Sequence, residues 1–365
     1  MKSSNILHVF ANSSWKGGEQ YVFNLSKKLI VDGYTVTFVA RKNPVLSKQL
    51  NKMGKVVAFL PLKGMFDFYS AIRMAHLFRK NNISVVHVHS FKDAFTAVYA
   101  RLLVKKSIRI VLTQHLIKQG KSNLLYSWLY KQIDKFIFLS KKARTTFLSD
   151  QLPSLENKSA VVYNSLYENE MPASSLPLPL RPMFGWDAAV PIFMFAGRVI
   201  AEKGADVLID ACIQLKEEPF YLLMVGDDTS AFASQLKQKV KKAGLQDRIK
   251  FYGFSVGVFS LIQECSIGVI PSVSTEIFNF PILEFMKSGK PIIATNNGSQ
   301  NECITQRKEG LLVHPNDVNQ LAKAMHELLH NPTLVQTIGH NAQKKYEKEL
   351  SYTTFYAKMI AAYFR

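Results

Sequence analysis

The chain has 365 residues, a length that favours two domains of roughly 150–180 residues each. Apolar residues make up 47% and charged residues 20%, the balance of a globular chain and not of a disordered one. Its 3 cysteines form no Cys-x-x-Cys pair, which excludes a disulfide framework or a structural zinc site of that kind. No run reaches about 18 apolar residues, and the first residues lack the apolar stretch of a signal peptide. We therefore expect a cytoplasmic chain without a membrane span.

The surplus of positive charge lies entirely in the first half. Up to Ser165 the sequence has 26 basic and 7 acidic residues, and after it 20 of each, so the first half accounts for the whole net charge of +19. A one-sided field of this size indicates an anionic partner, such as a membrane surface, an anionic glycan or nucleic acid. Because no nucleic-acid-binding module is recognisable, we do not expect nucleic acid.

The first half alternates short β-rich runs with segments whose apolar residues recur at helical spacing, which predicts an α/β fold with a doubly wound parallel sheet. The predicted strands are Ile6–Phe10, Thr35–Ala40, Val56–Leu60, Val85–His89, Ile108–Thr113 and Phe136–Leu139. The predicted helices are Glu19–Val31, Phe68–Arg79 and Phe95–Leu103.

A proline-rich stretch, residues 167–187, separates this series from a second one and is predicted to be a linker. It divides an N-terminal domain over residues 1–166 from a C-terminal domain over residues 188–351. Since parallel α/β sheets bind ligands at the carboxyl ends of their strands, we expect the two domains to face each other across a ligand-binding cleft. The second series of strands is predicted at Ile192–Ala196, Tyr221–Val225, Ile249–Tyr252, Ile267–Ile270, Pro291–Ala294 and Gly310–Val313.

Two cations follow the first strand of the second half. Arg198 and Lys203 lie between Gly197 and Gly204, just before a helix predicted over Val207–Leu215. A guanidinium, an ammonium and the positive end of a helix dipole together suit a diphosphate. Taken alone, the pattern is more typical of two solvated side chains at a turn.

Two glutamates eight residues apart flank a second helix start. Glu276 lies in a loop, and Glu284 lies on the first turns of a helix predicted to begin at Asn279 or Phe280, with Pro281 where a missing N–H costs nothing. Near such an N-terminus a carboxylate can accept sugar hydroxyls while free amides face a phosphate. The spacing by itself is common.

Taken together and in order, these motifs resemble the retaining glycosyltransferases of family 4. The second half supplies GR-x4-KG, Val225-Gly226-Asp227, Phe251-Tyr252-Gly253, E-x7-E, Asn297-Gly298 with Glu302, and Gly310-Leu311-Leu312-Val313. The first half supplies a Gly17-Gly18-Glu19 loop, Val85–Ser90, Thr113-Gln114-His115 and Val161–Asn164. The resemblance covers essentially the whole chain. It implies the GT-B fold, with two Rossmann-like domains facing across a cleft and the last helix, residues 352–365, packing back on the first.

The resemblance also implies which residues act in catalysis. Arg198 and Lys203 would neutralise the diphosphate of a nucleotide-sugar donor as it leaves. Glu276 would hold the transferred sugar, and His115 would lie near it. Because fixed donors offset the charge that develops on the diphosphate, such a site needs no metal and no other cofactor.

Further residues are implied to bind the donor. Glu284 would bind the ribose hydroxyls, and the backbone after Glu276 would contact the sugar. Two glycines of the first half would let the backbone approach the substrates closely. The additional donor-binding set is therefore Gly17, Gly18, Ile277, Phe278, Asn279 and Glu284.

Four departures from the family pattern bear on activity. The family usually has glycine at the positions of Ile277, Asn279 and Asp228, and its Gly-Gly-x-Glu loop is one residue longer than the loop here. These changes either alter donor choice or mark a weak or inactive member.

Other chemistries find less support. Gly253–Gly257 fits the G-x-S-x-G pattern of a hydrolase, for which Asp317 with His326 or His330 would complete a triad, but so short a match is weak without its context. Neither half has G-x-G-x-x-G after its first strand, which argues against a dinucleotide oxidoreductase.

Two histidines on one predicted strand raise a metal alternative. His87 and His89 lie on the same face, and His-x-His can ligate a metal, but no carboxylate or cysteine nearby in the sequence completes a site. We expect His87 in the core and His89 towards the cleft, and no metal site.

The basic half has two amphipathic segments, Phe66–Arg79 and Leu124–Lys131, which suit either a helix on anionic lipid or a core helix with a basic edge.

The sequence as a whole predicts a retaining, metal-independent glycosyltransferase, peripheral on the inner face of the cytoplasmic membrane. It would transfer a sugar to an anionic glycan or glycolipid acceptor, in cell-surface polysaccharide or lipopolysaccharide biosynthesis. The alternative is a non-catalytic member that binds a sugar nucleotide or glycan without turnover.

Overall fold

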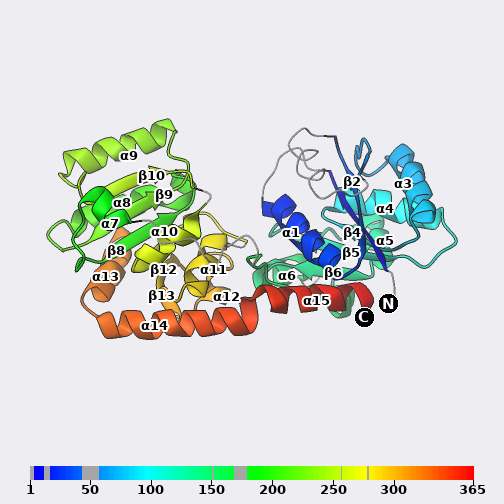
Figure 1. Ribbon diagram of the computed structural model, residues 1–365. Coiled ribbons are helices and arrows are strands. Elements are labelled where there is room, and N and C mark those ends of the chain that lie inside the picture. Colours follow the sequence, from blue (N-terminus) through cyan, green and yellow to red (C-terminus); the bar gives the residue numbers. More distant parts are fainter. Residues whose placement is uncertain are drawn as a thin grey trace. The chain divides into compact units, whose positions relative to one another are not determined.

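The computed structural model describes residues 4–11, 17–42, 57–149, 152–167, 179–255, 257–277 and 279–365. These residues belong to two compact units (Figure 1). Unit 1 comprises Met1–Asn164 and Phe355–Arg365, and unit 2 comprises Ser165–Thr354. Each unit is an α/β structure with its own parallel sheet.

The sheet of unit 1 has seven strands in the order β3-β2-β1-β4-β5-β6-β7, and all of its neighbours pair in parallel. The chain order reverses between β1 and β4, which is the switch point where doubly wound sheets bind ligands. The strands are β1 (Asn5–Phe10), β2 (Thr35–Ala40), β3 (Val57–Phe59), β4 (Ile83–Val88), β5 (Arg109–Gln114), β6 (Lys135–Phe138) and β7 (Ser159–Val161).

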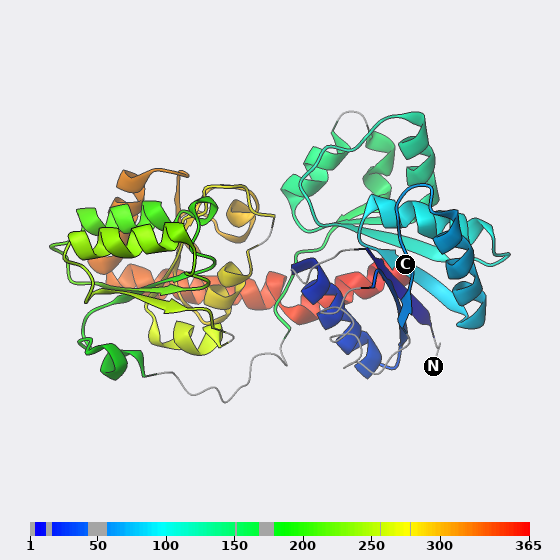
Figure 2. The ribbon, with the colours of Figure 1, turned by 90° about the horizontal axis from the view of Figure 1, so that it is seen from above.

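Helices cover both faces of this sheet, with α1 and α15 on one face and α3, α4 and α5 on the other (Figure 2). Strand alternation separates the two sides: Leu7 and Val86 join the aliphatic core under α3 and α4, whereas His8 and His87 point to the α1 and α15 face. The helical elements are α1 (Gly17–Val31), α3 (Phe68–Lys80), α4 (Phe91–Leu102), α5 (Leu124–Gln132), α6 (Lys141–Leu148), η1 (Pro153–Lys158) and α15 (Tyr352–Phe364).

Polar side chains set the starts of four of these helices. Asp67, Ser90, Asn123 and Ser140 each accept a hydrogen bond from the backbone N–H three residues on, at the starts of α3, α4, α5 and α6. Such caps satisfy donors that have no partner inside the helix.

The sheet of unit 2 has six parallel strands in the order β10-β9-β8-β11-β12-β13, with its switch point between β8 and β11. Helices α8, α9 and α13 pack on one face, and α10 and α11 on the other. The strands are β8 (Ile192–Ala196), β9 (Tyr221–Val225), β10 (Ile249–Gly253), β11 (Ile267–Ile270), β12 (Ile292–Thr295) and β13 (Gly310–Val313).

The helical elements of unit 2 range from single turns to the fourteen-residue helix α14. They are α7 (Leu180–Phe184), η3 (Ala201–Lys203), α8 (Ala205–Gln214), α9 (Ala231–Lys242), α10 (Val258–Glu264), α11 (Phe280–Lys287), α12 (Gln300–Cys303), α13 (Val318–Leu329), α14 (Pro332–Lys345) and the π-helical turn η4 (Tyr346–Leu350).

All twelve predicted strands are present, each within two residues of its predicted ends, and the structure adds β7. The predicted Gly17-Gly18-Glu19 loop was wrong, because these residues form the first turn of α1. Glycine is tolerated there since the first amides of a helix have no intrahelical partner. The residues that would precede this turn as a loop, 12–16, lie outside the described ranges.

Most of the predicted linker, residues 168–178, lies outside the described residues. Its last part, residues 179–187, packs on unit 2. Leu180 in α7 is fully buried, and the Trp186 indole stacks on Tyr221, with ring centroids 4.6 Å apart, and donates to the Asp247 carbonyl. These described residues of the predicted linker therefore pack as part of unit 2.

Two further features of the described residues concern membrane spans and cysteines. None of their helices has both the length and the apolar character needed to cross a bilayer. Cys212, Cys265 and Cys303 are free, buried thiols.

Candidate functional site

In unit 2 a lysine and a glutamate meet at the switch point of the sheet. Lys203 ends the turn η3 after β8, and Glu276 lies in the loop between β11 and α11. The Lys203 Nζ lies 2.5 Å from the Glu276 Oε1. Both side chains are mostly buried, with 24% and 17% of their surface exposed, so the pair is better shielded from solvent than an ordinary surface ion pair.

The backbone around Glu276 is fixed by close packing. Its carbonyl accepts from the Ser299 N–H at 3.0 Å. Gly298 has a φ of +69°, and a Cβ added there would lie 2.1 Å from the Glu276 carbonyl oxygen. Only glycine fits this contact. Glycine at position 298 therefore lets Glu276 approach β12 closely enough to face Lys203.

A second backbone contact ties the two loops of the site together. The Glu202 carbonyl accepts from the amides of Val273 and Ser274, at 3.0 and 3.2 Å. This carbonyl belongs to the residue before Lys203. The loop that carries the cation and the loop that carries the carboxylate are thus joined through the main chain, next to the ion pair.

Two helix N-termini open at these loops. Helix α8 follows Gly204, which has no side chain to cap it, and Asn279 at the start of α11 makes no capping hydrogen bond within the described residues. The first amides of α8 are therefore open to an anion, which the helix dipole also favours. At α11 the Ile282 amide already donates to the Asn279 carbonyl at 3.1 Å. Pro281 in the first turn of α11 costs no hydrogen bond. Phe278, a predicted donor-binding residue, lies outside the described residues, and Ile277 beside it is half-buried.

Arg198 follows the end of β8, five residues before Lys203. Its side chain is exposed, and the Val199 amide after it donates to the Asp227 carbonyl at 2.9 Å. Hydrogen bonds from Thr229, together with the Arg198 charge, lower the pKa of the Asp227 carboxyl. Asp228, at a position where the family usually has glycine, lies 2.6 Å from the Lys237 ammonium.

The Glu284 carboxyl lies on the second turn of α11 in a desolvated position. Burial raises its pKa to about 7, because the charged form loses solvation there. Near neutral pH this carboxyl can therefore either donate or accept a hydrogen bond.

Unit 1 brings four histidines together at its own switch point. The His8 Nδ1 lies 3.3 Å from the His89 Nε2, and the His89 Nδ1 lies 3.2 Å from the His115 Nε2. These three side chains form a chain of imidazoles across β1, β4 and β5. Sequence reasoning missed His8, although the β1–β4 register pairs it with His87.

The outer end of this chain opens into a cavity of about 580 Å³. His89 and His115 line it together with Ser90, Lys92, Lys118 and Lys121. Burial lowers the pKa of His8 to about 3 and that of His115 to about 4, so both rings are neutral at pH 7. A neutral imidazole can donate and accept at once, as a polar substrate group requires.

His87 has a structural position, as expected from the sequence. It is fully buried, and its ring nitrogens contact the Tyr363 hydroxyl at 2.8 Å and the Thr113 hydroxyl at 2.7 Å. Tyr363 belongs to α15, which also accepts a hydrogen bond from Arg109 at the Ala362 carbonyl. The last helix is thereby fastened to the sheet of unit 1.

The residues nominated for a hydrolase have other partners. The Ser255 hydroxyl accepts from the Gly257 amide, and Asp317 caps α13 by accepting from the Gln320 amide. His326 and His330 both contact Glu218. These contacts give no support to a catalytic triad around Ser255.

Comparison with known families settles the class of protein. Residues 15–166 match the model described as Glycosyltransferase Family 4, and residues 180–345 match the model of glycosyl transferases group 1. The chain belongs to the family 4 glycosyltransferases. An uncharacterized glycosyltransferase of Methanocaldococcus jannaschii is 29% identical over 76% of this chain and 74% of its own length. The lipopolysaccharide core mannosyltransferase LpsB of Rhizobium meliloti is 26% identical, over 66% and 67%.

Solved structures with the same fold span nearly the whole of this glycosyltransferase. A glycosyltransferase from Rickettsia africae has a TM-score of 0.88 at 23% identity and covers 100% of this chain and 98% of its own. The Anabaena protein HepE, solved in complex with UDP, has a TM-score of 0.82 at 19% identity, with 98% of each chain covered. These neighbours show the GT-B fold, which confirms the fold class predicted from the sequence.

Proposed function

We propose that this glycosyltransferase retains the configuration of the transferred sugar and works without a metal. Its donor is a nucleotide-diphosphate sugar and its acceptor a glycan or glycolipid. The acceptor class follows the similarity to LpsB, whose name places that relative in lipopolysaccharide core biosynthesis. A nucleotide-diphosphate donor is supported by the HepE complex with UDP and by the phosphate-binding features of unit 2.

The observation that carries this proposal is the contact of Lys203 with Glu276 beside the uncapped start of α8. When a sugar leaves a diphosphate, negative charge builds on the phosphate and positive charge on the sugar ring. Lys203, Arg198 and the first amides of α8 stabilise the former, and the Glu276 carboxylate stabilises the latter. Lys203 thus turns from Glu276 towards the diphosphate when the donor binds, and the two charges of the site serve the two ends of the breaking bond.

We assign the ribose and the sugar of the donor to α11 and the loop before it. Glu284, with a pKa near neutrality, exchanges hydrogen bonds with the ribose hydroxyls. The backbone of Ile277, Phe278 and Asn279 contacts the sugar. In unit 1 we assign His115 to the reacting sugar, with its ring oriented by His89, and Gly17 and Gly18 at the start of α1 to close approach of the substrates.

The acceptor side is assigned to the basic unit 1. Lys92, Lys118 and Lys121 line the cavity that His89 and His115 also line, so an anionic acceptor would find three cations there. The charge surplus of the first half is consistent with this assignment.

We further propose that unit 1 lies on anionic lipid through α3. Phe66, Phe68, Tyr69 and Ile72 are each more than half exposed, an unusual gathering of large apolar side chains on one short segment. Arg79 and Lys80 end the same helix. Aromatic side chains beside basic ones are typical of an interfacial helix, and this arrangement favours a peripheral place on a membrane.

Vesicle pelleting tests the membrane proposal. The protein should sediment with vesicles of anionic lipid, less with neutral lipid, and progressively less as salt screens the basic face. Replacing Phe68 and Ile72 by serine should release it, whereas replacing Leu102 and Leu103, which are exposed at the end of α4, should not. Sedimentation that ignores both salt and the α3 substitutions would remove α3 from the interface.

A non-catalytic sugar-nucleotide-binding member is the second candidate, because Ile277 and Asn279 stand where the family usually has glycine and Asn279 is buried. Incubation with a panel of sugar nucleotides, with and without EDTA, separates the two. Release of nucleotide diphosphate with a glycosylated product of unchanged anomeric configuration supports transfer, while tight donor binding without release supports the second candidate. Transfer abolished by EDTA while the protein stays folded, as judged by its Tm, would contradict metal independence.

A further inference from the structure

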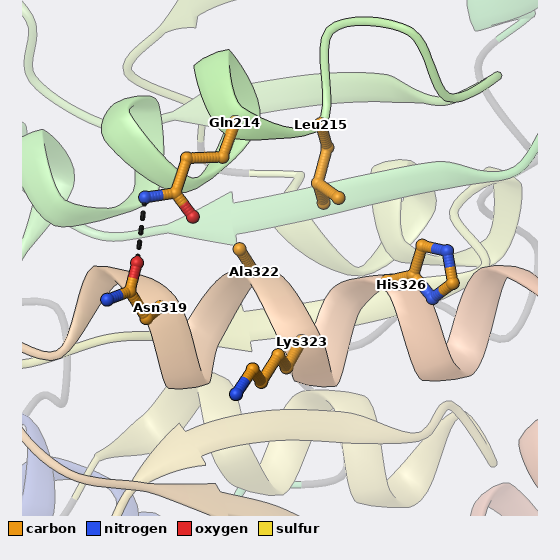
Figure 3. A pocket seen from close by; sticks show the side chains of 6 residues that line it. All are labelled: Gln214, Leu215, Asn319, Ala322, Lys323 and His326. Atoms are coloured by element: carbon orange, nitrogen blue, oxygen red, sulfur yellow. Dashed lines mark hydrogen bonds between the residues drawn. The ribbon is translucent and has the colours of Figure 1, made fainter.

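On the outer face of unit 2, helices α8 and α13 run beside an open groove of about 490 Å³ (Figure 3). The Gln214 side-chain Nε2 of α8 donates to the Asn319 side-chain Oδ1 of α13 at 2.9 Å and bridges the two helices. Farther along the groove lie Leu215 and His326. None of the residues assigned above to the transfer reaction lines this groove.

Three possible ligands gather where the chain turns from α8 towards β9. His326 and His330 lie four residues apart, on successive turns at the end of α13, so both rings face the same side. The His326 Nε2 lies 3.3 Å from one carboxylate oxygen of Glu218, and the His330 Nε2 lies 2.8 Å from the other. The three ligand atoms all lie within 4.8 Å of one another.

The segment that carries Glu218 is held in place without these histidines. Its amide donates to the Leu215 carbonyl at 2.9 Å. The Arg248 guanidinium donates to the carbonyls of Lys216, Glu218 and Phe220, which fixes the turn from the β10 side. The carboxylate therefore meets α13 from a fixed backbone, which lowers the entropic cost of closing a site.

Two imidazoles and one carboxylate are a ligand set for a borderline transition metal. Zinc takes such ligands at about 2.0–2.2 Å in tetrahedral geometry, with a water in any open position. Magnesium and calcium prefer oxygen ligands throughout. In the other histidine group, of His8, His87 and His89, ring nitrogens already contact one another, Tyr363 and Thr113, so those rings are less free to ligate.

We propose that Glu218, His326 and His330 form a zinc-binding site. The ion bridges the end of α13 and the turn after α8, and so adds a second clamp to the Gln214–Asn319 hydrogen bond. Each histidine binds the metal through the Nε2 lone pair as a neutral imidazole with its proton on Nδ1, and any excess proton is released to solvent. The Glu218 carboxylate offsets part of the charge of the ion. Because the site binds the folded unit only, zinc stabilises that unit by mass action. This role is independent of the transfer reaction.

The test uses the full-length protein without a polyhistidine tag, stripped of metal by a chelator that is then removed. Zinc is titrated in competition with a chromophoric chelator, and Tm is followed in parallel. We expect one zinc ion per chain and a Tm that rises with zinc but not with magnesium. The three cysteines are buried and compete little.

Single variants assign the ligands. His326→Ala and His330→Ala should each weaken zinc binding by more than the roughly 10–100-fold cost of losing an outer-shell partner. Glu218→Gln keeps a hydrogen-bonding side chain but removes the charge, and should also weaken binding. The matched control is His340→Ala, which removes an exposed histidine from α14 and should leave the affinity unchanged.

Folding of each variant is checked by its Tm without metal, which should stay close to that of the parent because both histidine side chains are about half exposed. The proposal is overturned if the double variant His326→Ala/His330→Ala binds zinc as tightly as the parent. It is equally overturned if zinc shifts the Tm of the parent no more than magnesium does.

Discussion

The two units share a topology but differ in what they place at the switch point of the sheet. In unit 1, β1 and the ends of β4 and β5 carry imidazoles; burial keeps those of His8 and His115 neutral at pH 7. In unit 2 the ends of β8 and β11 carry an ammonium and a carboxylate in contact, beside helix N-termini without side-chain caps. One scaffold thus supplies neutral hydrogen-bonding groups in unit 1 and paired charges in unit 2.

The two units also differ in how closely their backbones pack around these groups. Unit 2 brings its loops together through glycines: a Cβ at Gly226 would lie 1.8 Å from the Gly197 carbonyl oxygen, and one at Gly298 would collide with Glu276. These contacts let main chain pack on main chain beside the loops to which we assign the diphosphate. In unit 1 aromatic rings pack beside the histidines, such as Tyr21 against His89 and His115. The proposed roles, phosphate recognition in unit 2 and positioning of an uncharged group in unit 1, would thus rest on different neighbours.

The largest expected effect is on the rate of sugar transfer. It tests whether the cations of unit 2 stabilise the leaving diphosphate. Lys203→Ala should lower kcat by about 10²–10³, equivalent to roughly 2.7–4 kcal/mol, because a fixed donor to the leaving diphosphate is lost. Arg198→Ala should act in the same direction. Steady-state kinetics with the donor found in the nucleotide-sugar panel measure both.

Lys239→Ala is the matched control for these variants. Lys239 is also a lysine of unit 2 in an ion pair, with Asp210, but on the outer helices. Its loss should leave kcat unchanged. Equal rate losses in Lys203→Ala and Lys239→Ala would show that the Lys203 ammonium contributes to the stability of the protein and not to stabilisation of the leaving group.

Much of the fold could be predicted from the sequence because its signals are local. β-rich runs such as Ile192–Ala196 and Tyr221–Val225 are long, apolar and bounded by turn residues, and they appear in the structure with the same ends. The short strand β7 was missed, since its three residues, Ser159–Val161, have no periodicity to detect.

The sites were less accessible because they depend on which strands become neighbours. His8 is a single polar residue within the apolar strand β1, and only the strand order β1-β4-β5 brings it close to His89 and His115. A usable signal did exist, since His89 and His115 each directly follow a strand. Glu218 and His330 are 112 residues apart, and nothing in the sequence links them.

The next effect is on stability against pH, where the two units should respond in opposite directions. In unit 1 the folded state keeps buried histidines unprotonated, so between their folded pKa and about 6.5 the unfolded state binds more protons. Stability is then full above about pH 6.5 and falls as the pH drops. For His8, with a pKa of about 3, lowering the pH from 6.5 to 5 costs about 2 kcal/mol. His87, His89 and His115 shift in the same direction.

Buried carboxyls act with the opposite sign. Burial raises the pKa of Glu284 in unit 2 to about 7, so there the folded state binds more protons between about 4.5 and 7, and stability rises as the pH falls. Asp93 in unit 1, also raised to about 7, offsets only part of the histidine effect. Hydrogen exchange followed by mass spectrometry between pH 7 and 5 resolves the units. Protection should fall in unit 1 and hold or rise in unit 2, and Glu284→Gln should remove the rise. Parallel loss in both units would contradict the assignment.

The smallest effect concerns the close backbone packing of unit 2, and two glycines allow a matched comparison. Gly298 and Gly244 have nearly the same left-handed conformation, with φ of +69° and +73°, but a Cβ at Gly244 meets nothing within 4 Å. Alanine at either position pays the same backbone cost. Gly298→Ala also forces its methyl group against the Glu276 carbonyl, and should cost about 1–3 kcal/mol more in urea unfolding, as overpacking does elsewhere.

The same pair of variants shows whether this packing serves the site or only the fold. Relief of the clash at Gly298 requires the Glu276 backbone to move, and with it the carboxylate that faces Lys203. Transfer by Gly298→Ala should therefore fall even at temperatures where the variant is fully folded, while Gly244→Ala transfers like the parent. If the two variants lose equal stability and keep equal rates, the loop yields to a methyl group, and the position of Glu276 must be set by its hydrogen bonds alone.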